Sequence, residues 1–133
     1  MNVGDVGEAT LVVGPGDTAK GLSQSADDNF PDVFATSRMI LLMEVAASRL
    51  MRPGLDAGQL SVGVGVNIEH LAATPLGVEV KAAATFLGME GKLYRFKVEA
   101  FDAGGLVGQG SHTRAIIKTD RLVAGAASRT GKV

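Results

Sequence analysis

Residues 33–52, VFATSRMILLMEVAASRLMR, constrain the fold more than any other part of this chain. They contain no glycine or proline, are rich in Met, Leu and Ala, and end at Pro53-Gly54, which together predict one long α-helix. The middle of this helix is apolar nearly all round, so it must be buried on several sides. We therefore expect a central helix that other elements wrap around, and not a helix lying on a surface.

The remainder of the chain is patterned mainly for β-strands. Residues 5–13 predict a short first strand, and the prolines, glycines and acidic residues of 14–32 predict a long loop, of a kind that often covers a site. Beyond the helix, tight turns separate further strands. These four strands are expected at residues 61–74, 78–88, 92–102 and 106–119. Strands joined by successive hairpins form an antiparallel meander.

The order of these elements predicts one α+β domain over residues 1–120, in which a curved antiparallel sheet wraps a single central helix. Residues 121–133 are expected to form a frayed C-terminal tail. One helix covering one face of a sheet leaves edge strands open, and dimerisation would cover such edges. A homodimer is therefore expected.

Composition excludes several classes of function. The chain has 133 residues, 46% hydrophobic and 20% charged, which suits one packed domain. Its net charge of −1 gives no electrostatic reason to expect a nucleic acid or a membrane as partner. The absence of cysteine excludes disulfides and thiolate nucleophiles, and two widely spaced histidines do not predict a metal site. No signal peptide or membrane-spanning run is visible, so a cytoplasmic location is expected.

Glu44 and His70 are the first candidates for chemistry. Glu44 has apolar neighbours at every helical offset. A carboxylate in such surroundings must find a partner or have its pKa raised, and catalytic bases and nucleophiles need either arrangement. The alternative is a structural carboxylate paired with Arg114. Strict alternation along residues 61–74 places His70 on the face toward the helix, near Glu44, and Gly63 on the opposite face. His70 and Glu44 could then form an acid–base pair, the alternative being a histidine satisfied within the core.

Thr36, near the start of the helix, has two interpretations. It is either an N-cap or a hydroxyl held at the positive end of the helix dipole, where an anion would be stabilised. Eight residues separate it from Glu44, which corresponds to about 80° around the helix axis. Both side chains could therefore border one pocket.

Arg114 shares a side of its strand with His112, Gly108 and Gly110. Glycines at alternate positions leave a groove that a ligand or another backbone can approach closely. Arg114 could bind a phosphate or carboxylate there, or it could be a solvated or ion-paired strand residue.

Five short elements occur in the order and at the intervals typical of a known family. They are Phe34-Ala-Thr36, Leu42-Met-Glu44, Gly63, His70 followed by Leu-Ala-Ala-Thr-Pro75, and Gly110-Ser-His-Thr-Arg114. Over most of residues 30–118 the chain resembles the fluoroacetyl-CoA thioesterase-like family of hotdog-fold proteins. The resemblance implies a homodimeric hotdog enzyme that hydrolyses a short-chain acyl-CoA to the free acid and CoA. CoA is part of the substrate, and no further cofactor or metal is implied.

Roles for individual residues follow from the same resemblance. Thr36, Glu44 and His70 correspond to the catalytic set of the family. Gly63 and Arg114 correspond to residues that line the site, with the backbone N–H of Gly63 a candidate for holding the thioester oxygen.

Three other positions bear on the acyl group. Phe30 corresponds to a loop phenylalanine that gates the acyl pocket. Asp27 stands where the fluoroacetyl-specific enzyme has a second loop phenylalanine, and Val45 stands where that enzyme has a tryptophan. These two departures argue against specificity for fluoroacetyl-CoA.

Thioester hydrolysis needs an activated nucleophile, oxyanion stabilisation and protonation of the leaving thiolate. We hypothesise that His70 is the general acid or base, oriented by Glu44 or Thr36. Either water attacks directly, or Glu44 attacks to give a transient anhydride. The alternatives for the whole protein are a hotdog acting on aryl or medium-chain thioesters, a hydratase-like relative, or a non-catalytic sensor or carrier of an acyl-CoA or small acid.

Overall fold

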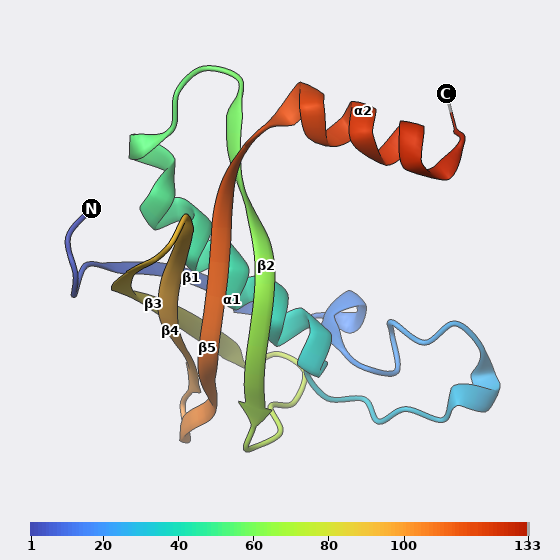
Figure 1. The fold of residues 1–133 in the computed structure, drawn as a ribbon. Helices are drawn as coiled ribbons and strands as arrows, with labels where there is room; N and C mark the ends of the chain where they lie inside the picture. The colour runs from blue at the N-terminus through green and yellow to red at the C-terminus, as the bar shows by residue number, and fades with distance from the viewer. Residues whose placement is uncertain (133) are drawn as a thin grey trace.

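A computed structural model describes residues 1–132. Within this part of the chain, one five-stranded sheet curves around a long helix, and a second helix follows the last strand (Figure 1). The strands and α-helices are β1 (Val6–Val12), α1 (Thr36–Met51), β2 (Gln59–His70), β3 (Glu79–Glu90), β4 (Leu93–Asp102), β5 (Gly105–Lys118) and α2 (Thr119–Thr130). Short 3-10 turns lie at Pro15–Asp17, Ala26–Asp28 and Arg52–Gly54. The predicted α+β class and the central helix are confirmed.

The sheet has the strand order β1-β3-β4-β5-β2, and all neighbouring strands are antiparallel. β3, β4 and β5 form the expected meander. β2 does not pair with β3, as a simple meander would require, but with β5, so β1 and β2 are the edges. Natural edge strands are usually protected against further pairing, yet β2 exposes Leu60, Val64 and Val66.

The curved sheet buries one side of α1. The inward side chains of this helix, all at most 5% exposed, are Met39, Leu42, Met43, Ala46, Ala47 and Met51. Opposite them β3 presents Ala82 and Ala84, whose small side chains let the helix lie close to the sheet. Gly7 in β1 allows a closer approach still, because a Cβ there would overlap the Ala46 carbonyl. Each large apolar side chain buried here contributes about 1.5–3 kcal/mol, so this interface is a main source of stability.

A β-bulge in β2 changes which side chains face α1. Gly63 pairs with Arg114 and Gly65 pairs with Thr113, so Val64 is an extra residue with no residue opposite it. The bulge shifts the alternation by one position, and both Gly63 and His70 therefore face the helix. The expectation of strict alternation, which put these two residues on opposite faces, is wrong. The inward placement of His70 is confirmed.

The C-terminal segment also differs from its prediction. Residues 119–130, expected to be frayed, form α2, which ends at Gly131 in the left-handed conformation common at helix C-termini. The segment contains Leu, Arg and several Ala residues, which favour a helix even without burial, and none of its residues is buried. Among the helices of residues 1–132, none has the length and apolar character needed to cross a membrane.

Candidate active site

Thr36 and His70 meet at the N-terminal end of α1. Thr36 Oγ1 lies 2.8 Å from His70 Nδ1, a hydrogen-bonding distance. The N-cap of α1 is Ala35, so Thr36 does not have the capping role considered from the sequence. A cavity of about 410 Å³ lies beside the pair and is also lined by Phe34 and Leu71. The hydroxyl and the imidazole are thus held together at the edge of an open space.

The other ring nitrogen of His70 is not engaged. Nε2 is buried and has no hydrogen-bond partner within residues 1–132. Burial lowers the pKa of His70, and the nearby backbone of Ala72 opposes this shift. The neutral imidazole is therefore favoured near pH 7, and a neutral imidazole can take a proton from water or a hydroxyl.

Glu44 forms a second cluster with Arg114. Arg114 Nη1 donates a hydrogen bond to Glu44 Oε2 at 3.0 Å. The Arg114 side chain is 6% exposed and that of Glu44 is 34% exposed, so solvent reaches the carboxylate but hardly reaches the guanidinium. Glu44 also lines a cavity of about 260 Å³ together with Gly63 and His112. The carboxylate has the ion-pair partner that the sequence suggested, and it remains accessible to a small ligand.

The Arg114 guanidinium is fixed by hydrogen bonds on three sides. Nε donates to Ser61 Oγ at 3.1 Å and Nη2 donates to the Ser61 carbonyl at 2.9 Å. Nη1, besides its bond to Glu44, lies 3.1 Å from His112 Nε2. Alternation along the strand predicts that His112 shares a face with Arg114, but nothing in the sequence indicates Ser61 as a partner of Arg114. Ser61 becomes a neighbour only because β2 pairs with β5.

Glycines in the two paired strands have different roles. A Cβ on Gly63 would overlap Glu44 Oε2 and lie 3.2 Å from His112 Cε1, so a larger residue there would displace the carboxylate. The groove expected at Gly108 and Gly110 is filled from within the chain. Met39 occupies the space at Gly108, and the Asn67 carbonyl lies against Gly110. Of the two alternatives, close approach of another backbone holds for Gly110.

The two clusters are separate within one chain. Thr36 and Glu44 are eight residues apart on α1, which is about 12 Å along the helix axis. Gly63 and His70 are seven residues apart on β2, or about 20 Å in an extended strand. The clusters line different cavities. The expectations that His70 lies near Glu44 and that Thr36 and Glu44 border one pocket are therefore wrong for a single chain.

Phe30 lies on the long loop between β1 and α1 and is 52% exposed. The two arms of this loop are joined by backbone hydrogen bonds from Ala19 to Val33 and from Lys20 to Pro31. Its tip extends past β2 in Figure 1, away from the body of the chain. Within the described chain, Phe30 lines neither of the two cavities above.

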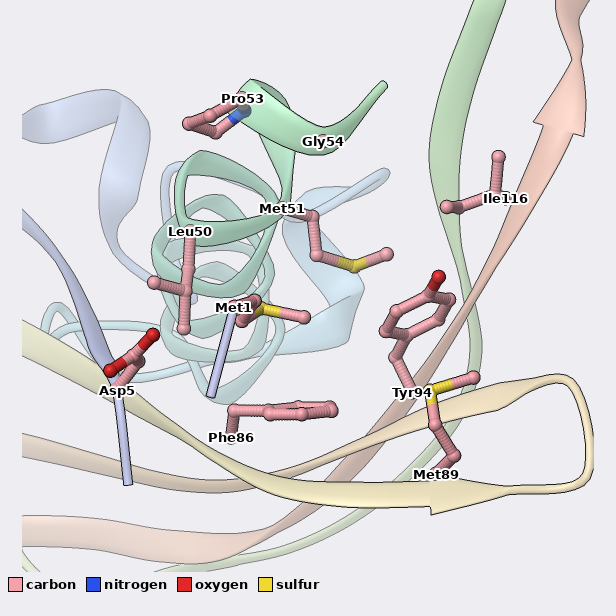
Figure 2. A pocket seen from close by; sticks show the side chains of 10 residues that line it. All are labelled: Met1, Asp5, Leu50, Met51, Pro53, Gly54, Phe86, Met89, Tyr94 and Ile116. Carbon is pink, nitrogen blue, oxygen red and sulfur yellow. The ribbon is translucent and has the colours of Figure 1, made fainter. Parts of the chain in front are cut away.

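A third cavity of about 500 Å³ lies at the C-terminal end of α1 (Figure 2). The side chains of Met51, Phe86 and Tyr94 surround it. Met51 is 15 residues from Thr36, or about 22 Å along the helix. Among the described residues that line this cavity there is none of the six predicted for the site.

Comparison with known proteins identifies one family. The sequence profile of a family described as fluoroacetyl-CoA-specific thioesterase matches residues 13–120. The chain belongs to this family. It is 36% identical to the fluoroacetyl-CoA thioesterase of Streptantibioticus cattleyicolor over 132 residues, which cover 98% of this chain and 95% of that protein. The chain is thus a thioesterase, a hydrolase acting on acyl-CoA thioesters, as the sequence predicted.

Solved structures of relatives have the same fold. The fluoroacetyl-CoA thioesterase FlK matches with a TM-score of 0.91 and 36% identity, over 96% of each chain. A thioesterase superfamily member from Thermus thermophilus matches with a TM-score of 0.86 and 26% identity, over 98% of this chain and 94% of that one. A hot-dog-like protein from Thermanaerovibrio acidaminovorans matches with a TM-score of 0.80 and 26% identity, over 96% and 91%. The predicted hotdog fold is confirmed.

Proposed function

We propose that the protein hydrolyses a short-chain acyl-CoA at a site built by two copies of the chain. One copy contributes Thr36 and His70, and the other contributes Glu44, Gly63 and Arg114. The proposal rests on the division of the expected catalytic set between two clusters that lie at different points along the edge strand β2. Each cluster has part of the chemistry that hydrolysis needs, and neither has all of it.

Antiparallel pairing of two β2 edges would bring the clusters together. In such a pair with twofold symmetry, each residue lies opposite one at the same distance from the symmetry axis. If Val64 is left out of the pairing as the bulged residue, an axis through Asn67 sets His70 of the partner subunit opposite Gly63. The two cavities would then join across the interface, with the Thr36–His70 pair on one side and Glu44 on the other.

Exposed features on the side of β2 support this arrangement. The free edge carries Val64, 57% exposed, and Val66, 44% exposed, and Leu41 of α1 is exposed as well. Both the long loop and α2 extend past β2 in Figure 1. A second copy paired at this edge would cover the apolar side chains and would meet the loop that carries Phe30.

The chemistry follows from the two clusters. Thr36 holds His70 Nδ1, which leaves Nε2 to take a proton from the nucleophile and return it to the leaving thiolate. The Gly63 N–H and the Arg114 charge stabilise the developing oxyanion. Glu44, paired with Arg114, either orients the attacking water or attacks the thioester itself to form an anhydride. Oxygen-18 incorporation into Glu44 during a single turnover distinguishes the two routes, because only the anhydride route labels the side chain.

Two observations support a short acyl group as substrate. The cavity beside Glu44 and Gly63 has a volume of about 260 Å³. The relative from Streptantibioticus cattleyicolor is a fluoroacetyl-CoA thioesterase. Asp27, exposed on its 3-10 turn, and Val45, packed against the core, differ from the corresponding residues expected for fluoroacetyl specificity. We therefore propose a short acyl group other than fluoroacetyl as the preferred substrate.

A panel of acyl-CoA thioesters tests the substrate proposal. Release of free CoA thiol is measured for acetyl, fluoroacetyl, butyryl, octanoyl and benzoyl thioesters with the wild-type protein. The expected result is the highest kcat/KM for a short acyl group. A maximum for octanoyl or benzoyl contradicts the short-chain proposal, and binding without thiol release from any substrate contradicts hydrolysis.

Mixing two inactive variants tests the shared site. His70→Ala and Glu44→Ala each remove one half of every site, so each variant alone is expected to be inactive. After subunit exchange, a mixed dimer contains one site with both residues intact. Random assortment of equal amounts then restores about a quarter of the wild-type activity.

The matched control mixes His70→Ala with the double variant Glu44→Ala/His70→Ala, in which no combination of subunits completes a site. This mixture is expected to stay inactive. If the site lies within one chain, both mixtures stay inactive, and the proposal of a shared site is wrong. Light scattering on the same samples establishes whether the protein is a dimer.

The other expectations about partners remain predictions from the sequence. They are a cytoplasmic location, no nucleic-acid or membrane partner, and no cofactor besides the CoA of the substrate.

A further inference from the structure

His112 is a buried ionisable residue that the chemistry above does not use. It lies on β5, is 3% exposed, and stacks obliquely against Phe96 with ring centroids 6.4 Å apart. It lies between two parts of the site, because its ring is near Gly63 on one side and Arg114 on the other. Its role can be read from the hydrogen bonds of its two ring nitrogens.

Each ring nitrogen of His112 has a partner that can act only as a hydrogen-bond donor or only as an acceptor. Nδ1 lies 2.8 Å from the carbonyl oxygen of Gly65, which only accepts, so Nδ1 must carry the proton and donate. Nε2 lies 3.1 Å from Nη1 of Arg114, a guanidinium that only donates, so Nε2 must be the acceptor. One neutral tautomer satisfies both contacts, and the other tautomer satisfies neither.

The surroundings also disfavour a charged imidazolium. Burial lowers the pKa of His112; the Gly65 carbonyl opposes this shift, the Arg114 charge adds to it, and the Glu44 charge opposes it. Protonation would set an Nε2–H against the N–H groups of Arg114. The surroundings of His112 therefore favour the neutral ring with its proton on Nδ1.

These two hydrogen bonds join parts of the site that are otherwise held separately. Gly65 ends the bulge that turns Gly63 toward the helix. Arg114 holds the Glu44 carboxylate. Since His112 contacts both Gly65 and Arg114, it sets the position of the bulge relative to the ion pair. A shift of its ring would move the Gly63 backbone and Glu44 relative to each other.

We propose that His112 is a positioning residue of the thioesterase site, which in one neutral tautomer clamps the β2 bulge to the Arg114–Glu44 pair. Its role is to hold these groups in place, and it does not transfer a proton. This inference rests on the proposed function, because its kinetic consequences concern the same site. Its structural part can be tested without any activity.

Nitrogen-15 NMR of the histidine rings in the wild-type protein tests the tautomer. His112 is expected to show the Nδ1–H neutral form throughout pH about 6 to 8, without titrating. The Nε2–H tautomer, or titration in the ordinary histidine range, overturns the proposal. This measurement is independent of the proposed function, which fails separately if the wild-type protein releases CoA from no thioester.

Three variants test the kinetic role. His112→Phe keeps a ring of similar size but removes both hydrogen bonds. His112→Asn can still place a donor near the Gly65 carbonyl, and His112→Gln can still place an acceptor near Arg114. We expect kcat of His112→Phe to fall about tenfold to a hundredfold with KM nearly unchanged, as for slight misplacement of reacting groups. Asn and Gln are each expected to recover part of this loss.

Val80→Ala is the matched control for lost packing. Val80 is fully buried in β3, which β4 and β5 separate from β2 in the sheet. The control is expected to lower the melting temperature without lowering kcat. A wild-type kcat in His112→Phe overturns the positioning role. The positioning role is also overturned if Val80→Ala and His112→Phe lose kcat in the same proportion to their losses of stability. The effect of His112 would then be one of packing alone.

Discussion

At Gly63 the backbone of β2 passes so close to the Glu44 side chain that an added Cβ would have to displace the carboxylate. A Cβ there would overlap Glu44 Oε2, whereas a Cβ at Gly65 would meet only the end of the Thr113 side chain, at 3.0 Å. Neither glycine needs a positive φ. The requirement at Gly63 is therefore one of space, imposed by the carboxylate opposite.

Gly63→Ala is expected to displace the Glu44 carboxylate and lower kcat by about tenfold or more, since reacting groups tolerate little misplacement. Gly65→Ala is expected to keep most of the activity, because the Thr113 hydroxyl can rotate away. The two variants are compared by kcat and by crystal structures. An equal loss of kcat in both variants would contradict this prediction. It would show that the bulge tolerates an added side chain at neither glycine.

The long loop between β1 and α1 has its own set of polar contacts. Thr18 is fully buried, and its hydroxyl donates to Asp32 Oδ1 at 2.9 Å while accepting from the Gly21 N–H at 3.0 Å. Asp17 pairs with Arg38 of α1 at 2.7 Å. These contacts join the base of the loop to itself and to the helix. The tip, which carries Phe30, is left exposed.

Thr18→Val keeps the shape of the side chain but leaves the Gly21 N–H and the Asp32 carboxylate without this partner. The cost is about 1–3 kcal/mol, because a buried donor loses its hydrogen bond. Opening of the loop is expected to speed tryptic cleavage after Lys20 and to raise KM. Gln24→Ala, which truncates an exposed side chain of the same loop, is the control and is expected to cleave at the wild-type rate.

The whole molecule has two histidines, and burial lowers the pKa of both His70 and His112. In the unfolded chain both return to the ordinary range. The unfolded state therefore binds more protons than the folded state as the pH falls through that range. The contribution of the two histidines to the free energy of unfolding is therefore fully present above the ordinary histidine pKa. It is lost as the pH falls toward their lower pKa in the folded state.

Lowering the pH from about 7.5 to about 5.5 is thus expected to decrease the free energy of unfolding, by at most about 1.4 kcal/mol per pH unit from His112. Urea denaturation at several pH values and one protein concentration measures this dependence. His112→Asn is expected to give a shallower slope. A slope unchanged in this variant would mean that His112 does not contribute to the pH dependence.

Much of the fold could be predicted because it depends on local patterns. The central helix follows from an apolar run without glycine or proline. The inward side of His70 follows from its spacing of two residues from Ile68, which packs against the core beyond the bulge. The C-terminal helix is not predicted, because the segment lies at the end of the chain, where fraying is common, and none of its residues is buried. Glu44 stood out since a charge in an apolar helix needs an explanation.

What the sequence determined by itself is therefore the helix, the strands, the family and the identity of the unusual charged residues. Only the tertiary structure decided how Glu44, Arg114, Ser61 and His112 come together, and that Thr36 rather than Glu44 contacts His70. The physical reason is that these contacts join residues far apart in the chain. They depend on the pairing of β2 with β5 and on the bulge at Val64, and neither leaves a periodic signal in the sequence.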